Sequence, residues 1–127
     1  MRTFALDAAC ARCAYDRSDA LVWGEPILCA VCDARERGIS EIEHHHVAGQ
    51  ANSPFTIALD ANAHREITAL QIRLVPHDVL RNPQELHYLR WSAWLYGIAV
   101  LFIWFAEYLK HYVTAHYRNM ESLSHGV

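Results

Sequence analysis

Hydrophobic residues are distributed unevenly along the chain. The longest apolar block covers residues 91–106 and contains no charged side chain, whereas the residues before it hold only short apolar runs. With its flanks, this block predicts one helix over residues 88–112, with apolar side chains on every face. A polar tail over residues 113–127 follows it.

Two short strands, a loop and a helix are predicted in the middle of the chain. Alternating side chains favour strands over residues 39–47 and 55–59, and the Gly, Asn, Ser and Pro residues between them favour a loop. Asp60 is a suitable N-cap for the helix that follows. Residues 39–74 are therefore predicted to form a ββα unit, joined to the apolar helix by a connector over residues 75–87.

The composition is that of a folded chain. Of its 127 residues, 53% are apolar and 20% are charged, which suits one ordinary domain or two very small modules. The net charge is −3, so the basic excess with which nucleic-acid-binding domains neutralise phosphates is missing. This counts against a tight, sequence-independent DNA clamp and leaves open a weak or tethered nuclease.

Two CxxC pairs lie near the N-terminus and contain all the cysteines of the chain: Cys10, Cys13, Cys29 and Cys32. Fifteen residues separate the pairs, a spacing typical of a four-cysteine zinc site. Residues 24–26 predict a turn between two short strands. Residues 1–38 are therefore predicted to form a small zinc-ribbon-like β-hairpin module that holds a structural Zn²⁺. Disulfides are the weaker alternative, because the N-terminus carries no export signal.

Three segments in the middle of the chain carry polar residues in a fixed order: His45-His46-Val-Ala-Gly49, Asn52-Ser-Pro54 and Asn62-Ala-His64-Arg65-Glu66. Together they resemble the signature of the HNH (His-metal finger) endonucleases, over about a quarter of the chain. The resemblance implies an α+β fold with a ββα-metal finger at its centre.

The same resemblance implies a role for each histidine. His45 and His64 match the ligands of one catalytic divalent cation, Mg²⁺ or Mn²⁺, and His46 matches the general base that activates water to hydrolyse a DNA phosphodiester bond. Metal-dependent hydrolysis by these residues is chemically reasonable, because a cation neutralises the charge that develops on the phosphate. An imidazole with its ordinary pKa near 6.5 is available as a base at neutral pH.

The chain departs from the family pattern at two places. Many relatives carry a second pair of cysteines where this chain has Asp60 and Ala63, and the N-terminal cysteines are expected to take over their structural role. The middle Asn of the signature is expected where this chain has Phe55. Asn52 and Asn62 are both candidates to orient the base, and Asn52 is favoured.

The register of the histidine run is a second open point. Strand alternation sends His44 and His46 to one face and His45 to the other. The match to Val-Ala-Gly sets the register used above, and a slip of one residue would exchange the ligand and the base.

The apolar helix over residues 88–112 is long enough to span a membrane. Aromatic residues near both of its ends resemble interfacial belts, and Arg90 and Lys110 bracket it. An oligomerisation helix, which would bring together two active sites for the two strands of a duplex, and a buried core helix are the alternatives. If the helix spans, the arginines before it favour a cytoplasmic nuclease module anchored to the inner face of the membrane.

Two functions are consistent with these patterns. The first is a metal-dependent endonuclease that cuts DNA by a one-metal mechanism with a histidine base. The second is a non-catalytic, membrane-tethered zinc-binding protein that uses an HNH-like scaffold to bind a partner protein, which the net charge and the missing middle Asn favour. Metal analysis of the wild type and of His64→Ala discriminates between them.

Overall fold

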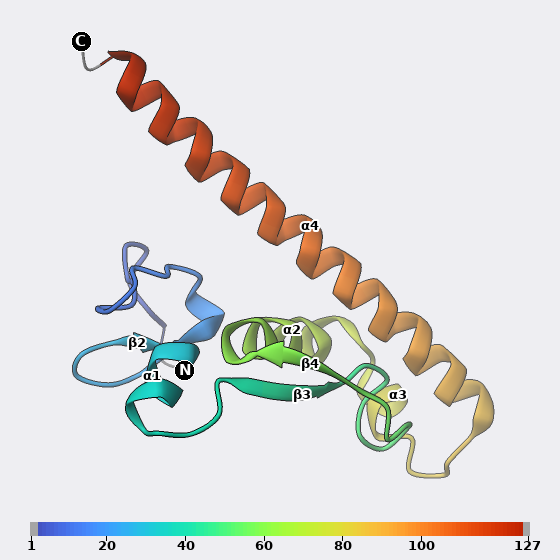
Figure 1. The fold of residues 1–127 in the computed structure, drawn as a ribbon. Coiled ribbons are helices and arrows are strands. Elements are labelled where there is room, and N and C mark those ends of the chain that lie inside the picture. Colours follow the sequence, from blue (N-terminus) through green and yellow to red (C-terminus); the bar gives the residue numbers. More distant parts are fainter. Residues whose placement is uncertain (1–2, 126–127) are drawn as a thin grey trace.

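The computed structural model describes residues 3–125 and has an α+β fold. A short 3-10 helix, Ser18–Ala20, comes first. The remaining elements follow in the order β1 (Leu21–Val22), β2 (Leu28–Cys29), α1 (Ala30–Glu36), β3 (Ile42–His46), β4 (Thr56–Asp60), α2 (Ala61–Leu74), α3 (His77–Arg81) and α4 (His87–His125) (Figure 1). The expected α+β class, the two antiparallel hairpins and the long C-terminal apolar helix are confirmed.

The N-terminal hairpin leads directly into a helix. Strand β1 pairs with β2, with Leu21 opposite Cys29, and Cys29 is also the N-cap of α1. Apolar side chains around the cysteines complete a small core of their own, and they include Phe4, Tyr15, Leu21 and Leu28. The zinc-ribbon-like description is not confirmed, because the second cysteine pair begins a helix.

The central ββα unit folds from adjacent segments. Strands β3 and β4 are antiparallel, with His45 opposite Ile57 and His46 opposite Thr56. Helix α2 begins at once after β4, because Asp60 Oδ1 accepts a hydrogen bond from the backbone N–H of Ala63 at 2.8 Å. The N-cap expected from the sequence is thus the one that the structure contains.

Two helical segments extend beyond the sequence expectation. The five residues of α3 lie within the connector and are too few to show a helical period. Helix α4 continues through the tail as far as His125, and no glycine or proline interrupts residues 98–125. The polar composition of the tail therefore does not end the helix.

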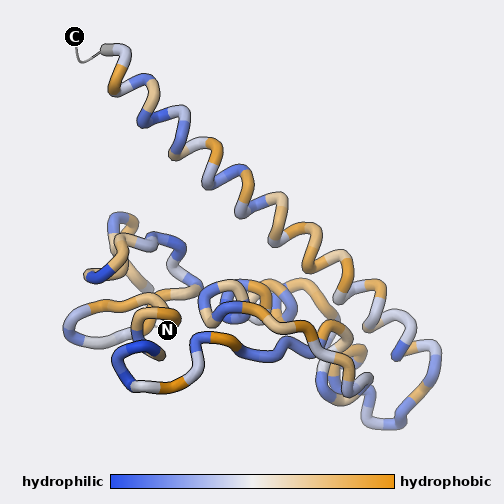
Figure 2. Tube along the Cα trace, viewed as in Figure 1, coloured by the Kyte–Doolittle hydropathy of each residue, from blue (hydrophilic) through white to orange (hydrophobic). Residues whose placement is uncertain are grey.

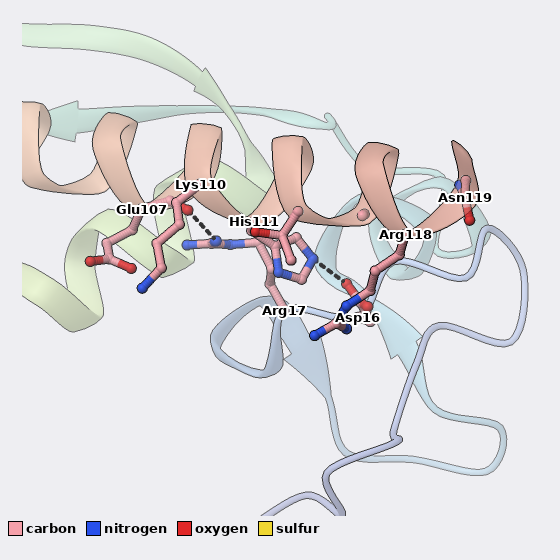
Figure 3. Close-up of a pocket in the computed structure, with 9 residues that line it drawn as sticks. Asp16, Arg17, Glu107, Lys110, His111, Arg118 and Asn119 are labelled. Carbon is pink, nitrogen blue, oxygen red and sulfur yellow. Dashed lines mark hydrogen bonds and ion pairs between the residues drawn. The ribbon is translucent and has the colours of Figure 1, made fainter. Parts of the chain in front are cut away.

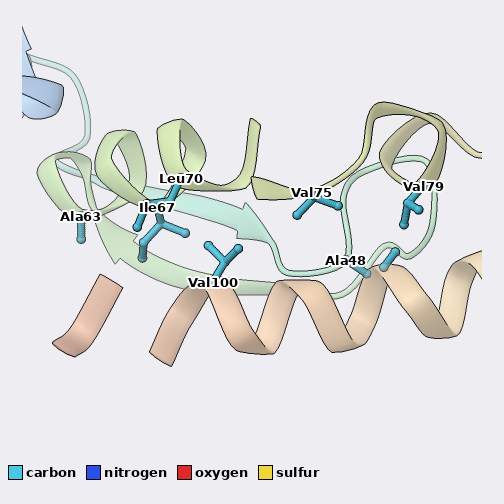
Figure 4. Close-up of a cluster of buried hydrophobic side chains, with 8 residues drawn as sticks. Ala48, Ala63, Ile67, Leu70, Val75, Val79 and Val100 are labelled. Carbon is cyan, nitrogen blue, oxygen red and sulfur yellow. The ribbon is translucent and has the colours of Figure 1, made fainter. Parts of the chain in front are cut away.

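Helix α4 covers the ββα unit. Its Ala93 and Val100 join a buried cluster that contains Ala48, Ala63, Ile67, Leu70, Val75 and Val79 (Figure 4). Gly97 is required for this approach, since a Cβ atom there would lie 1.9 Å from the carbonyl oxygen of Val47. Hydrophobic residues dominate the first half of α4 (Figure 2). Many of their side chains on the side away from the ββα unit are exposed.

A buried carboxylate joins three parts of the chain. Glu66 of α2 forms an ion pair with Arg17 and accepts hydrogen bonds from Tyr15 Oη at 2.9 Å and from Trp104 Nε1 at 3.3 Å. Burial and the nearby Glu66 carboxylate raise the pKa of Tyr15, so its hydroxyl stays a donor. This network ties the N-terminal segment to α2 and α4.

Candidate functional site

The four cysteines come together as one cluster. Their Sγ atoms all lie within 4.8 Å of one another, and Cys13 Sγ is 3.7 Å from Cys29 Sγ. Thiolates on a tetrahedral Zn²⁺, with Zn–S bonds of about 2.3 Å, are about 3.8 Å apart. Among the described residues, this is the one group of three or more such side chains with its ligand atoms so close. The cluster is compatible with a structural zinc site.

The environment of the thiols changes their acidity in opposite directions. Burial raises the pKa of Cys10, but hydrogen bonds from the backbone of Cys29 and of residues 12–13 outweigh it and bring this pKa to about 6. Burial and the neighbouring thiols raise the pKa of Cys32 to about 12. A bound dication would stabilise all the thiolates, so zinc binding is expected to release protons.

The first histidine of the predicted site, His45, points from β3 toward α2. Its side chain is 2% exposed, and its Nε2 atom is buried with no hydrogen-bond partner among the described residues. Burial, His64 and His46 lower the pKa of His45 to about 4, so the ring is neutral at pH 7. A buried, neutral imidazole with one free nitrogen is the form that binds a metal ion.

The second predicted ligand, His64, lies against the first. The rings of His45 and His64 meet edge to face, with centroids 5.7 Å apart. His64 Nδ1 is also hydrogen-bonded to a carboxylate oxygen of Glu43, which lies two residues before His45 on the same face of β3. This bond leaves Nε2 of His64 as the nitrogen available to a ligand.

The predicted base, His46, points to the other face of β3. Its Nδ1 lies 3.3 Å from the carbonyl oxygen of Ser53 in the loop between β3 and β4. An Nδ1–H donated to that carbonyl leaves Nε2 with the lone pair that a general base needs. The alternation expected from the sequence therefore separates the base from His45.

The two faces open into different clefts. Glu43 and His64 line a cleft of about 470 Å³ between α1 and α2. His46 lines a second cleft, of about 500 Å³, together with Ser53 and Arg90. Strand β3 therefore stands between the candidate metal ligands and the candidate base.

The two asparagines bind the main chain and not a histidine ring. The Nδ2 group of Asn52 donates to the carbonyl oxygens of Ala48 and Val79, both at 3.0 Å, and so closes the loop that carries Ser53. The Oδ1 atom of Asn62 accepts from the backbone N–H of Val31 at 3.0 Å and joins α1 to α2. Asn52 therefore affects His46 indirectly, because it holds the loop whose Ser53 carbonyl lies beside the His46 ring.

Two residues that sequence reasoning did not select support the histidines. Glu43 lies two residues before His45, and this spacing alone places both side chains on one face of β3. Gln71 Nε2 donates to the carbonyl oxygens of His46 and Val47, at 3.3 and 3.2 Å. Because Gln71 lies two helical turns after His64, its position on the same face of α2 was the signal that could have found it.

A further cleft lies between the N-terminal segment and the second half of α4. It has a volume of about 450 Å³, and its lining includes Asp16, Arg17, Lys110, His111 and Arg118 (Figure 3). His111 Nε2 lies 2.8 Å from Asp16 Oδ1, and Arg17 donates to the carbonyl of Glu107 at 3.4 Å. These contacts hold α4 against the N-terminal segment.

Comparison with family models, with curated proteins and with solved structures gives no match.

Proposed function

We propose that this protein is a metal-dependent endonuclease that hydrolyses DNA phosphodiester bonds. The observation that carries the proposal is the buried, unpartnered Nε2 atom of His45 beside the ring of His64. A buried polar atom without a partner is costly, and a metal ion is one group that removes this cost. The ββα arrangement around these rings also agrees with the resemblance to the HNH endonucleases.

In this proposal, His45 and His64 hold one divalent cation. When bound, the cation would neutralise charge on the phosphate and leave coordination positions open to the substrate. Glu43 holds His64 by its Nδ1 atom. His46 is the proposed base that takes a proton from the attacking water, and the Ser53 carbonyl lies beside its ring. Because His46 lines a different cleft from His64, the proposal requires the phosphate to bind at the end of β3, where both clefts can be reached. DNA and this module would meet in the cytoplasm.

A plasmid-nicking assay with Mg²⁺ or Mn²⁺ tests the proposal. We expect cation-dependent nicking, and we expect His46→Ala to lower its rate by about 10²- to 10⁴-fold, the usual contribution of a general base. His116→Ala, an exposed histidine of α4, is the matched control and should nick as the wild type does. Full activity of His46→Ala would reject this mechanism.

The second candidate is a non-catalytic zinc-binding protein that binds a partner protein. One observation favours it: the cysteines, and not the histidines, form the fully assembled ligand group among the described residues. It predicts one zinc ion per chain, no nicking with any cation, and the same metal content in His64→Ala. Loss of a second, weaker metal site in His64→Ala would instead favour the endonuclease.

A further inference from the structure

Helix α4 has two faces with different environments. Its inner face carries Ala93, Gly97 and Val100, which are buried against the ββα unit. Its outer face carries a row of large apolar side chains, each 43–73% exposed: Tyr88, Trp91, Leu95, Ile98, Phe102, Phe105, Leu109 and Tyr112. We call this row the outer stripe.

The spacing within the outer stripe is that of a helix-pairing seam. Its residues follow one another at alternating intervals of three and four, from Tyr88 to Tyr112. A repeat of 3.5 residues keeps one line of side chains facing a second helix over several turns. The spacing of the outer stripe therefore suits packing against another helix.

The register of the outer stripe ends at Tyr112, because its next two positions are His116 and Asn119. Val113, Tyr117 and Met120 are further exposed apolar residues in the polar end of α4, outside that register. A lone helix that projects into water, as the end of α4 does in Figure 1, is also marginally stable by itself.

The exposed area is sufficient for a stable pair. Large apolar and aromatic side chains bury up to about 150–250 Å² each, so the outer stripe exposes on the order of 1,000 Å². A standard protein interface buries about 800 Å² on each partner. A patch of this size is larger than those that monomeric proteins usually expose.

The packing of the inner face argues against a membrane as the occupant. Among the described helices, α4 is the one that is long and apolar enough to cross a membrane by length and composition. However, Val100 lies in the middle of its apolar block and packs against the ββα unit. Spanning would carry the loop of residues 47–55, with its polar main chain, into hydrocarbon or would strip it from the helix.

We propose that a second copy of this chain covers the outer stripe, with the two α4 helices parallel. In a parallel pair each stripe residue meets its own equivalent, so the apolar blocks match and the polar ends match. The two ββα units then lie on opposite sides of the helix pair. This inference does not depend on the proposed nuclease activity.

Light scattering after size exclusion, on the full chain at micromolar concentration without detergent, tests the proposal. We expect twice the mass of the chain for the wild type and the mass of one chain for Leu95→Glu. Thr114→Glu, which places the same charge on α4 away from the stripe, should remain a dimer. Circular dichroism and zinc content show whether each variant is folded.

A mixing experiment separates pairing from misfolding. Leu95→Glu and Leu95→Lys are each expected to be monomeric, and their mixture is expected to recover the dimer mass, because residues 95 meet across a parallel pair. The proposal would be overturned if the wild type were monomeric or if the mixture failed to form the dimer. It would also be overturned if the wild type were recovered only in the fraction that contains vesicles of phosphatidylethanolamine and phosphatidylglycerol. The last result would identify the membrane as the occupant.

Discussion

The cysteine cluster and the histidine site differ in how the chain assembles them. Four thiols from two short motifs converge fully and are largely buried. The histidines come from β3 and α2; two rings meet, while His46 lies on the other face of β3. A structural metal site is closed by its own ligands, whereas a catalytic site keeps positions open. The cysteine cluster offers four ligand atoms from its own chain, whereas the histidine pair offers two.

Removal of zinc is expected to have the largest effect. Because the cysteines supply much of the N-terminal core, chelation or Cys29→Ser should cost on the order of 10 kcal/mol of folding free energy for this part of the chain. Thermal unfolding with and without a chelator, and after zinc is added back, measures the loss. An unchanged melting temperature would contradict the zinc site, and the cysteine cluster would then not differ from the histidine site in its contribution to stability.

Acid is expected to act on the histidine site through His45. Its pKa is about 4 in the folded chain and near 6.5 in the unfolded chain, so the unfolded chain binds more protons between these values. This part of the stability is present above pH 6.5 and is lost as the pH falls toward 4, by on the order of 3 kcal/mol. Urea unfolding across this window should give a smaller pH slope for His45→Asn, and equal slopes would contradict the burial of a neutral ring.

The contact of α4 with the end of β3 can be tested without touching either site. In Gly97→Ala, the new Cβ would clash with the Val47 carbonyl, and we expect a loss of about 1–3 kcal/mol. Gly24→Ala, where a Cβ meets its nearest atom at 3.4 Å, is the control and should change little. Zinc content should stay at one per chain, because the cysteines lie elsewhere. Equal stability of the two variants would show that α4 does not support β3.

The smallest effect is expected at Glu43. Its carboxylate is hydrogen-bonded to His64, so Glu43→Gln should weaken binding of the cation proposed at His45 and His64 by about 10- to 100-fold and leave the zinc content unchanged. Calorimetric titration with Mn²⁺ on zinc-loaded protein measures this. The matched control is Glu85→Gln, an exposed carboxylate in the connector. If Glu43→Gln bound Mn²⁺ as tightly as Glu85→Gln does, Glu43 would have no role in holding His64.

The parts of the fold that depend on neighbouring residues could be read from the sequence. The hairpins, the Asp60 N-cap and the convergence of the CxxC pairs each follow from contacts between nearby residues. Helix α3 could not, because five residues show no period. The register of β3 is shown by the structure, whereas a metal ion at the histidines and the activity stay predictions.

By itself, the sequence determined the local units: where strands alternate, where a helix is capped, and which thiols are close enough to share an ion. Only the tertiary structure decided that Gln71 holds the carbonyl of His46, that Glu43 holds His64, and which face of α4 is left exposed. The physical reason is that short-range patterns depend on backbone geometry, whereas these contacts depend on how α2, β3 and α4 pack against one another.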